Sequence, residues 1–324
     1  MRAVRVHELT GPSGRRIDEV ATPKPAGGQV LIDVKAAGVN FPDILITQGK
    51  YQFKPTPPFS PGAEAAGVVS AVGSGVTSLK VGDRVAATLL YGAYAEQVVA
   101  PELATVKLPD AVPFEVGAAT LLTYATTYHA LVDRAAIRAG ESLLVLGAAG
   151  GVGIAAVELG KLLGARVIAA ASSADKLAFC REHGASETID YSSEDLNERV
   201  KALTGGNGVD VIYDPVGGNL AEPALRAIAW QGRYLVIGFA AGDIPKIPLN
   251  LVLLKGCQIV GVFWGQFAMR SALENRKHCE QLFAWVAEGK LRPAIDATLP
   301  FERAGEALER LARREVKGKL VLVP

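Results

Sequence analysis

The chain has 324 residues, of which 49% are hydrophobic and 21% are charged, so it is long enough for two domains of ordinary size. Its 34 Lys and Arg residues nearly balance its 33 Asp and Glu residues, and this formal net charge of +1 favours neither a nucleic-acid-binding protein nor an acidic disordered tail. The three cysteines, Cys180, Cys257 and Cys279, are too few and too scattered for a disulfide framework or a four-thiolate zinc knot. With neither a signal-peptide core nor about 20 consecutive apolar residues, the sequence predicts a soluble, cytoplasmic protein.

The first region, from residue 1 to about 109, predicts short β strands separated by Gly and Pro residues. Strands are expected at Gln29–Lys35, Ala65–Val72, Asp83–Ala87 and Tyr94–Val99. We expect them to pack as an irregular, antiparallel barrel. The longest interruption, Phe41–Pro61, contains five prolines and several aromatic residues, which favours a rigid loop over a pocket. We expect substrate contacts in that loop.

The middle of the chain predicts a different fold class. A helix is expected from Pro113 to Ala136, and strands then alternate with helices. The expected strands are Ser142–Leu146, Arg166–Ala171, Val209–Tyr213 and Arg233–Ile237, and the expected helices are Gly151–Leu163, Ala174–His183, Ser193–Leu203 and Asn219–Trp230. Such alternation is typical of an α/β fold with a doubly wound parallel sheet. Near-continuous apolar strands fit a sheet that helices cover on both faces.

The last part of the chain predicts a return to the first domain. After a strand at Ile259–Phe263 we expect a long helix around Ala268–Glu288, a helix at Glu302–Arg313 and a final strand at Lys319–Val323. The predicted domains are therefore residues 1–124, completed by about 266–324, and residues 125–265.

The strongest local motif is a glycine loop within Leu143–Glu158, where an apolar strand runs into glycines and then into a helix. A dinucleotide pyrophosphate needs backbone N–H groups at a helix N-terminus and no side chain in the way. Gly147 permits the turn, Gly150, Gly151 and the neighbouring Val152 allow close approach, and Gly153 lets the helix pack on the strand. The alternative is an ordinary glycine-rich turn.

The residues after the second strand of this domain predict the type of cofactor. Folds that bind NADH place an acidic residue there, whereas this chain has Ser172, Ser173 and Lys176. These groups favour a phosphate, so we expect NADPH rather than NADH. Tyr191 is a further candidate contact. In the alternative, Ser172 is a helix cap that forms a capping box with Asp175.

Six short stretches together resemble one family: Ala37–Asp43, Gln48–Tyr51, Pro61–Glu64, Val81–Val85, Ala148–Gly153 and Gly318–Leu322. The chain is similar from end to end to the zinc-independent quinone oxidoreductase branch, which includes zeta-crystallin, of the medium-chain dehydrogenase/reductase superfamily. The resemblance implies a Rossmann domain together with a GroES-like barrel that carries the catalytic site.

The resemblance also bears on metals. Alcohol dehydrogenases of this superfamily hold a catalytic zinc with a Cys and a His in the motifs that here end in Asn40 and Glu64. Their structural zinc loop of four cysteines has no counterpart in Leu89–Pro101. We therefore expect no bound metal, and hydride transfer from NADPH to an acceptor that is already electrophilic, such as a quinone.

By the same resemblance, Asn40 and Tyr51 lie at the nicotinamide and act as hydrogen-bond donors to a developing oxyanion. Tyr51 is also a candidate proton donor, although it has an alternative role as one of several aromatic residues that pack the loop. Asp43 is expected to fix the loop, and Glu64 to be a buried structural carboxylate. Further cofactor contacts implied by the family are Thr126, Gly238, Phe239, Phe263, Gly265 and, near the adenosine phosphates, Lys319, for which a solvated lysine is the alternative.

Two other functions stay open at the level of sequence. An alkene, enone or enoyl-CoA reductase would share the fold, and Lys50 and Lys54 in the Pro-rich loop would suit an acyl-CoA. A non-enzymatic NADPH-binding protein or an RNA-binding, crystallin-like protein is the third reading, against which the balanced charge argues. The apolar segment Ile259–Phe263 favours a homodimer. The physiological acceptor, the number of electrons transferred in each step and the proton donor are not predicted.

Overall fold

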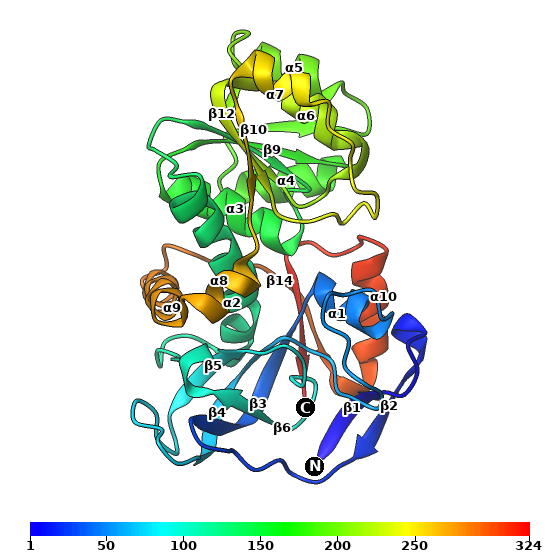
Figure 1. Cartoon of the computed structure of the whole chain (residues 1–324), viewed down its shortest axis with the longest axis vertical. Coiled ribbons are helices and arrows are strands. Elements are labelled where there is room, and N and C mark those ends of the chain that lie inside the picture. Colours follow the sequence, from blue (N-terminus) through cyan, green and yellow to red (C-terminus); the bar gives the residue numbers. More distant parts are fainter. The chain divides into compact units, whose positions relative to one another are not determined.

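The computed structural model describes residues 1–324, apart from the side chain of Ser13. The chain forms two compact units (Figure 1). Unit 1 consists of Met1–Ala125 with Phe267–Pro324, and unit 2 consists of Thr126–Gln266.

Unit 2 contains a six-stranded parallel sheet, with strands in the order β10-β9-β8-β11-β12-β13. Its strands are β8 (Ser142–Leu146), β9 (Arg166–Ala171), β10 (Glu187–Asp190), β11 (Val209–Asp214), β12 (Ile228–Val236) and β13 (Gln258–Gly261). The helices between them are α3 (Gly151–Leu162), α4 (Ala174–Glu182), α5 (Leu196–Leu203), α6 (Ala221–Arg226) and α7 (Leu249–Lys255). Two runs of strands diverge from β8 and β11, which is the doubly wound order of a dinucleotide-binding fold. The predicted α/β class is confirmed.

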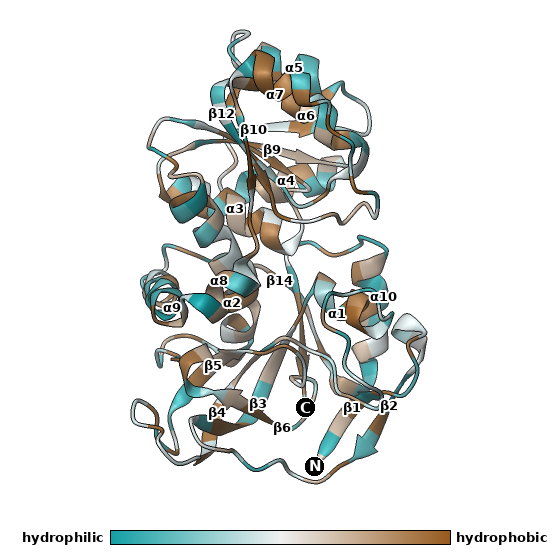
Figure 2. Cartoon of the chain, in the orientation of Figure 1, coloured by the Kyte–Doolittle hydropathy of each residue, from teal (hydrophilic) through white to brown (hydrophobic). Residues whose placement is uncertain are grey.

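The core of unit 2 explains why its strands are apolar along their whole length. Leu144, Ile168 and Ile212, on the three central strands, are fully buried because helices cover both faces of the sheet. Figure 2 shows the same contrast, with hydrophobic strands and with hydrophilic residues along the outer helices.

The predicted helix Asn219–Trp230 is wrong at its C-terminal end. Helix α6 ends at Arg226, and β12 begins at Ile228, which pairs with Val209 of β11. Ile228 is buried while Trp230, two residues later on the same strand, is exposed. Composition alone did not reveal this change from helix to strand, because Ile, Ala and Trp occur in both structures. Helix α7 was not predicted either.

Unit 1 contains a seven-stranded sheet that remains open. Its strand order is β14-β15-β3-β4-β5-β7, with β6 paired to β3. The strands are β3 (Gln29–Val39), β4 (Glu64–Val72), β5 (Arg84–Thr88), β6 (Gln97–Pro101), β7 (Thr105–Lys107), β14 (Ile295–Pro300) and β15 (Lys319–Val323). In the part of the chain that is described, no pairing joins β14 to β7, so the expected antiparallel barrel is corrected to an open sheet. One of its pairs, β14 with β15, is parallel.

The remaining elements of unit 1 differ in part from those that the sequence predicts. A two-stranded sheet forms from β1 (Arg2–Val6) and β2 (Arg15–Glu19). The Pro-rich stretch expected as a loop begins with a short helix, α1 (Phe41–Thr47). The helix expected around Ala268–Glu288 is divided at Ser271 into α8 (Trp264–Arg270) and α9 (Ala272–Ala287). Helix α10 (Ala304–Ala312) also belongs to unit 1. Helix α2 (Phe114–Tyr128) begins in unit 1 and ends in unit 2, where it continues as a π-helical turn at His129–Arg134.

The last strand determines which residues meet in unit 1. Strand β15 pairs antiparallel with β3, and Leu320 lies opposite Val39. Lys319 therefore lies beside the end of β3, where Asn40 follows and α1 begins. The chain thus brings together residues that are 279 positions apart.

Among the helices described here, none is both long enough and apolar enough to cross a bilayer.

Candidate functional site

The glycine loop of unit 2 joins β8 to α3 in a conformation that requires glycine. Gly147 has a φ of +58°, and Gly150 is the N-cap residue of α3. A Cβ atom on Gly153 would lie 2.3 Å from the carbonyl oxygen of Gly147 and 2.8 Å from Cα of Ala148. The first N–H groups of a helix have no partner within it, and the helix dipole adds partial positive charge there. This loop fits the pyrophosphate of a dinucleotide.

A second group of polar residues lies where β9 and β10 end. Strand β9 ends at Ala171, whose carbonyl oxygen accepts a hydrogen bond of 3.1 Å from the backbone N–H of Tyr191. Ser172 is exposed, and Lys176 lies in the first turn of α4. The predicted residues are thus brought together at one edge of the sheet.

The helix cap at this edge differs from the predicted alternative. Ser173, not Ser172, is the N-cap of α4, and its hydroxyl oxygen accepts a hydrogen bond of 3.4 Å from the backbone N–H of Lys176. The cap lies one residue later than expected because α4 begins at Ala174, and Ser172 links it to β9. The Ser172 hydroxyl is consequently not used as the cap.

The other predicted cofactor residues of unit 2 also follow strand ends. Gly238 and the exposed Phe239 come after β12, and the exposed Phe263 and Gly265 come after β13. Thr126 is half-buried on α2. Its neighbour Thr127 is buried, and its hydroxyl lies 2.8 Å from the hydroxyl of Tyr213, a partner that the sequence did not predict. All strands of a parallel sheet present their carboxyl ends at one edge, which is where doubly wound folds bind ligands.

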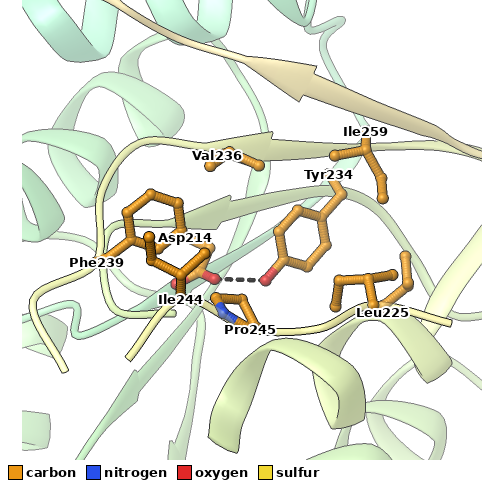
Figure 3. A pocket seen from close by; sticks show the side chains of 9 residues that line it. Asp214, Leu225, Tyr234, Val236, Phe239, Ile244, Pro245 and Ile259 are labelled. Carbon is orange, nitrogen blue, oxygen red and sulfur yellow. Dashed lines mark hydrogen bonds between the residues drawn. The ribbon is translucent and has the colours of Figure 1, made fainter. Parts of the chain in front are cut away.

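A small apolar hollow of about 200 Å³ lies at the same edge of unit 2 (Figure 3). Its lining consists of Asp214, Leu225, Tyr234, Val236, Phe239, Ile244, Pro245, Ile247 and Ile259. The Tyr234 hydroxyl donates a hydrogen bond to Asp214, which also accepts bonds of 2.8 Å from the backbone N–H groups of Val216 and Gly217. The carboxylate is thus satisfied within the protein. The hollow is smaller than typical ligand pockets of roughly 300–1,000 Å³, so we do not assign it to a dinucleotide.

In unit 1, Asn40 and Asp43 together cap helix α1. The backbone N–H of Asn40 donates a hydrogen bond of 2.8 Å to Oδ2 of Asp43, and the Tyr94 hydroxyl donates another of 2.8 Å to the same oxygen. Burial raises the pKa of Asp43 to about 6, against the hydrogen bonds from Tyr94 and Asn40, which lower it. Its other oxygen, Oδ1, has no hydrogen-bond partner among the described residues. Asp43 fixes the start of α1, as expected, and Tyr94 is a partner that the sequence did not predict.

Asn40 also belongs to a buried network with Glu64 and Lys319. The Lys319 ammonium donates hydrogen bonds to the backbone oxygen of Val39 (3.1 Å), to Oδ1 of Asn40 (2.5 Å) and to Oε2 of Glu64 (3.2 Å). Nδ2 of Asn40 donates to Oε2 of Glu64 at 3.2 Å and to the backbone oxygen of Gly38 at 3.3 Å. These three side chains are at most 3% exposed. Glu64 is thus buried and hydrogen-bonded, as expected.

This network defines what Lys319 can contact. An ammonium group has three hydrogens, and protein oxygens accept from all three here. A cofactor phosphate would have to displace one of these acceptors from a side chain that is 3% exposed. The expected contact with the adenosine phosphates remains a prediction.

Tyr51 lies half-buried beside an aromatic cluster. Its ring packs against Phe59 and the apolar side chains of Val6 and Ile46. Burial raises the pKa of Tyr51, and the charge of Asp43 raises it further, so the phenol keeps its proton at neutral pH.

The aromatic cluster extends to the surface of unit 1 through Tyr91. Its ring contacts Phe59 edge to face at 6.0 Å and stacks on Phe53 at 5.5 Å between ring centroids. Tyr91 follows β5 and carries no motif, so only the structure shows that it belongs with the Pro-rich loop.

The residues at Asn40 and Glu64 do not fit a zinc ion. Zinc in proteins is usually held by thiolate and imidazole groups, with an occasional carboxylate. Here the buried groups are an amide, one carboxylate and the Lys319 ammonium, which itself occupies the position between their oxygens. A divalent cation at this position would meet a buried like charge. We derive no chemical step through a metal at this position.

Comparisons with known proteins agree with this geometry. Residues 26–110 match the family model of the alcohol dehydrogenase GroES-like domain, and residues 151–287 match that of zinc-binding dehydrogenases. The chain is 40% identical to the quinone oxidoreductase-like protein 2 homolog of Nematostella vectensis, over 99% of this chain and 88% of that protein. It is 33% identical to human quinone oxidoreductase, over 100% and 98% of the two chains. The structure of Escherichia coli quinone oxidoreductase complexed with NADPH superposes with a TM-score of 0.94 at 32% identity, and each chain is covered in full.

The parallel sheet with its glycine loop and the GroES-like sheet define an oxidoreductase of the class that binds a nicotinamide dinucleotide. Within this class, the chain is 33–40% identical to quinone oxidoreductases and their homologues over essentially its whole length. The chain belongs to the quinone oxidoreductase-like branch of the medium-chain dehydrogenase/reductase superfamily.

Proposed function

We propose that this protein is an NADPH-dependent quinone oxidoreductase that transfers hydride without a metal ion. The observation that carries the proposal is the composition of the unit 1 site, in which an amide and a buried ammonium stand where a metal-dependent alcohol dehydrogenase needs metal ligands, so that the Tyr51 phenol is left to serve the acceptor. Such groups suit an acceptor that is already electrophilic. The similarity to quinone oxidoreductases over the full chain supports a quinone as that acceptor.

For the cofactor, we propose that the edge of unit 2 binds NADPH. Gly147 and Gly150 would shape the loop, and Gly151, Val152 and Gly153, at the start of α3, would hold the pyrophosphate through backbone N–H groups. We assign the 2′-phosphate to Ser172, Ser173, Lys176 and Tyr191, and the remaining contacts to Thr126, Gly238, Phe239, Phe263 and Gly265. The NADPH complex of the Escherichia coli relative supports this choice of cofactor.

For the chemistry, we propose that Tyr51 is the group that serves the acceptor. When bound, the reduced nicotinamide supplies the hydride. The Tyr51 hydroxyl donates a hydrogen bond to the acceptor oxygen, which becomes negatively charged as the quinone is reduced, and then delivers its proton. The overall reaction consumes one quinone, one NADPH and one proton, and it yields one hydroquinone and NADP⁺.

A panel of acceptors tests this function. Oxidation of NADPH is followed with quinones of different size, with enones, with haloacrylates and with enoyl-CoA esters. We expect the highest kcat/KM for a quinone. A higher value for an enoyl-CoA would favour the alkene reductase instead, for which Lys50 and Lys54, both exposed, would bind the acyl-CoA phosphates. Tight NADPH binding without turnover of any acceptor would favour a non-enzymatic binding protein.

We also propose that the protein is a homodimer that pairs through β13. Within the chain, as far as it is described, β13 pairs with β12 and with no other strand, so it is an edge strand of the sheet. Nearby apolar side chains are exposed: Trp230, Leu249, Leu253 and Leu254, and Figure 2 shows the hydrophobic character of α7. Such a patch together with an edge strand is typical of an interface. Ile259→Lys should give a monomer by light scattering, and an unchanged mass would contradict the proposal.

The cysteines support a reducing compartment, and we propose the cytoplasm. Cys180, Cys257 and Cys279 are all free and buried. Burial raises the pKa of Cys180 and of Cys279 to about 12, so these thiols stay protonated and unreactive.

A further inference from the structure

The side-chain amide of Asn40 lies between two groups with opposite hydrogen-bonding capacity. The Lys319 ammonium can only donate, and it contacts Oδ1 of Asn40 at 2.5 Å. The Glu64 carboxylate can only accept, and its Oε2 lies 3.2 Å from Nδ2 of Asn40. If the amide were turned over, its NH₂ group would face the ammonium and its oxygen would face the carboxylate. The two charged groups therefore fix the orientation of the amide.

The same contacts use all the hydrogens of the amide. One hydrogen of Nδ2 is directed to Glu64, and the other to the backbone oxygen of Gly38. Asn40 is 3% exposed. The Asn40 side chain therefore has no free N–H to donate to an acceptor oxygen. Tyr51 differs from Asn40 in this respect, because its hydroxyl can still be a direct donor.

From these contacts we propose that Lys319 is a positioning residue of the acceptor site, and that together with Glu64 it locks the Asn40 amide so that Asn40 positions α1 rather than touches the substrate. This inference rests on the proposed function for its kinetic consequence. It reassigns Asn40 and Lys319, which the family resemblance placed at the substrate and at the cofactor phosphates. Tyr51 is then the direct donor in unit 1.

The network explains how a residue near the C-terminus can act on the acceptor site. Glu64 lies on β4 and accepts a 3.0 Å hydrogen bond from the backbone N–H of Leu122 on α2, while Lys319 lies on β15. Asn40, held by both, is the N-cap of α1, and the same residue anchors Asp43. Four elements therefore fix the start of the segment that leads to Tyr51.

Energetics also favour a positioning role over a purely stabilising one. A buried ion pair loses hydration on both sides and is often no more stable than apolar side chains of the same size. A buried ion pair is nevertheless useful where its two charges fix the direction of a neighbouring dipole. The amide of Asn40 is such a dipole, since both charges contact it.

The experiment compares Lys319→Met, Glu64→Gln and the double variant. Lys107→Met is the matched control, because Lys107 forms a 3.1 Å ion pair with Asp83 on the surface of the same unit. In each single variant we expect kcat with a quinone to fall by about 10²-fold, because a misplacement of a reactive group by about 1 Å can have an effect of that size. The affinity for NADPH should be unchanged in all variants, and the control should keep its kcat.

The double variant separates positioning from stability. Each single variant leaves one buried charge without its partner, so the melting temperature should fall. In the double variant both charges are gone, and the melting temperature should recover towards that of the wild type. The value of kcat should stay low, because no ammonium then faces the amide. Recovery of kcat together with the melting temperature would mean that the pair is only structural and would overturn the proposal.

A second result would also overturn it. If Lys319→Met weakens NADPH binding while kcat at saturating NADPH stays at the wild-type value, then Lys319 contacts the cofactor. A positioning role therefore lowers kcat, whereas a cofactor contact weakens NADPH binding.

A spectroscopic measurement decides the proposal even if the wild type reduces no quinone, in which case the proposed function fails by itself. Protein labelled with ¹⁵N-asparagine gives side-chain signals from only six residues, and Asn40→Asp identifies those of Asn40. We expect the hydrogens of this amide to exchange slowly in the wild type and in Lys107→Met, and much faster in Lys319→Met. Equal exchange rates in Lys319→Met and the wild type would show that the ammonium does not lock the amide.

Discussion

The candidate sites of the two units differ in which atoms form them. At the edge of unit 2 the candidate site is a glycine loop that leads to the first backbone N–H groups of α3, at Gly151 to Gly153, all within a few consecutive residues. In unit 1 the candidate site consists mainly of side chains from elements that are far apart in sequence, and Lys319 contacts a residue 279 positions away. A backbone site depends on where side chains are absent, whereas a side-chain network depends on long-range packing. Substitutions should therefore affect the two sites by different mechanisms.

The largest effect is expected for Gly153→Ala, which adds a side chain where the backbone site cannot accept one. The new Cβ would lie 2.3 Å from the Gly147 oxygen, so the loop or the helix must move. We expect NADPH binding to be lost and the free energy of unfolding to fall by about 1–3 kcal/mol. Fluorescence titration with NADPH and denaturant unfolding measure the two effects. Gly27→Ala in unit 1 is the control, because the nearest atom to a Cβ there is the hydroxyl oxygen of Ser74 at 3.3 Å, at the end of a small side chain. Wild-type NADPH binding and stability in both variants would contradict the backbone model.

The next effect is expected for Tyr51→Phe, which removes one hydroxyl from the side-chain site. A phenol is protonated at neutral pH, and burial raises the pKa of Tyr51 further, so we expect this hydroxyl to donate its hydrogen, and its loss should lower kcat by about 10²-fold or more. NADPH affinity should not change. Tyr91→Phe removes a hydroxyl from the adjoining aromatic cluster and should keep the wild-type kcat. If both variants had the same kcat as the wild type, the proton would come from another group.

The contrast between the units also explains how far the sequence could predict this molecule. Strands β8, β9 and β15 begin and end at the predicted residues, because apolar β-branched runs and glycine punctuation are local signals. Strand β14 and helix α7 were missed, since one is a short mixed sequence and the other exposes its leucines. The closure of the unit 1 sheet was predicted wrongly because it depends on which edges pair.

Site residues follow the same division. The motif located Gly147 and Gly153 without help from the rest of the chain. The partners of Asn40 were not predictable, because Glu64 and Lys319 are 24 and 279 residues away in sequence and no spacing rule links them. Tyr94, which donates to Asp43, and Tyr213, which contacts Thr127, were missed for the same reason.

A third prediction concerns the pH dependence of stability, which the side-chain network of unit 1 should impose. Burial raises the pKa of Asp43 from 3.8 to about 6, so the folded state holds this proton more tightly than the unfolded state does. Its contribution to stability is therefore complete below pH 3.8, and it is lost as the pH rises to about 6. A shift of this size corresponds to about 3 kcal/mol.

Asp43→Asn tests this effect, because the variant cannot titrate at that position. The free energy of unfolding of the wild type, minus that of the variant, should decrease between pH 4 and 6 and stay constant above that range. Denaturant unfolding at a series of pH values gives the difference. Asp110→Asn, at an exposed position of unit 1, should show no such slope. A difference that rises with pH would mean that the Asp43 carboxylate is stabilised in the folded state.

The smallest effect is expected at the end of β9, where the backbone site of unit 2 ends in side chains. NADPH and NADH share the pyrophosphate that the glycine loop would hold, so the loop cannot distinguish them, and only the 2′-phosphate can. Ser172→Asp combined with Lys176→Ala replaces a hydroxyl and an ammonium by a carboxylate, which should weaken NADPH by about tenfold and spare or improve NADH. Titration with both cofactors gives the ratio of dissociation constants, and Lys201→Ala, on the exposed side of α5, should leave it unchanged. If the ratio in the double variant also stays unchanged, the phosphate is recognised by other residues, and backbone groups alone account for what this edge contributes to binding.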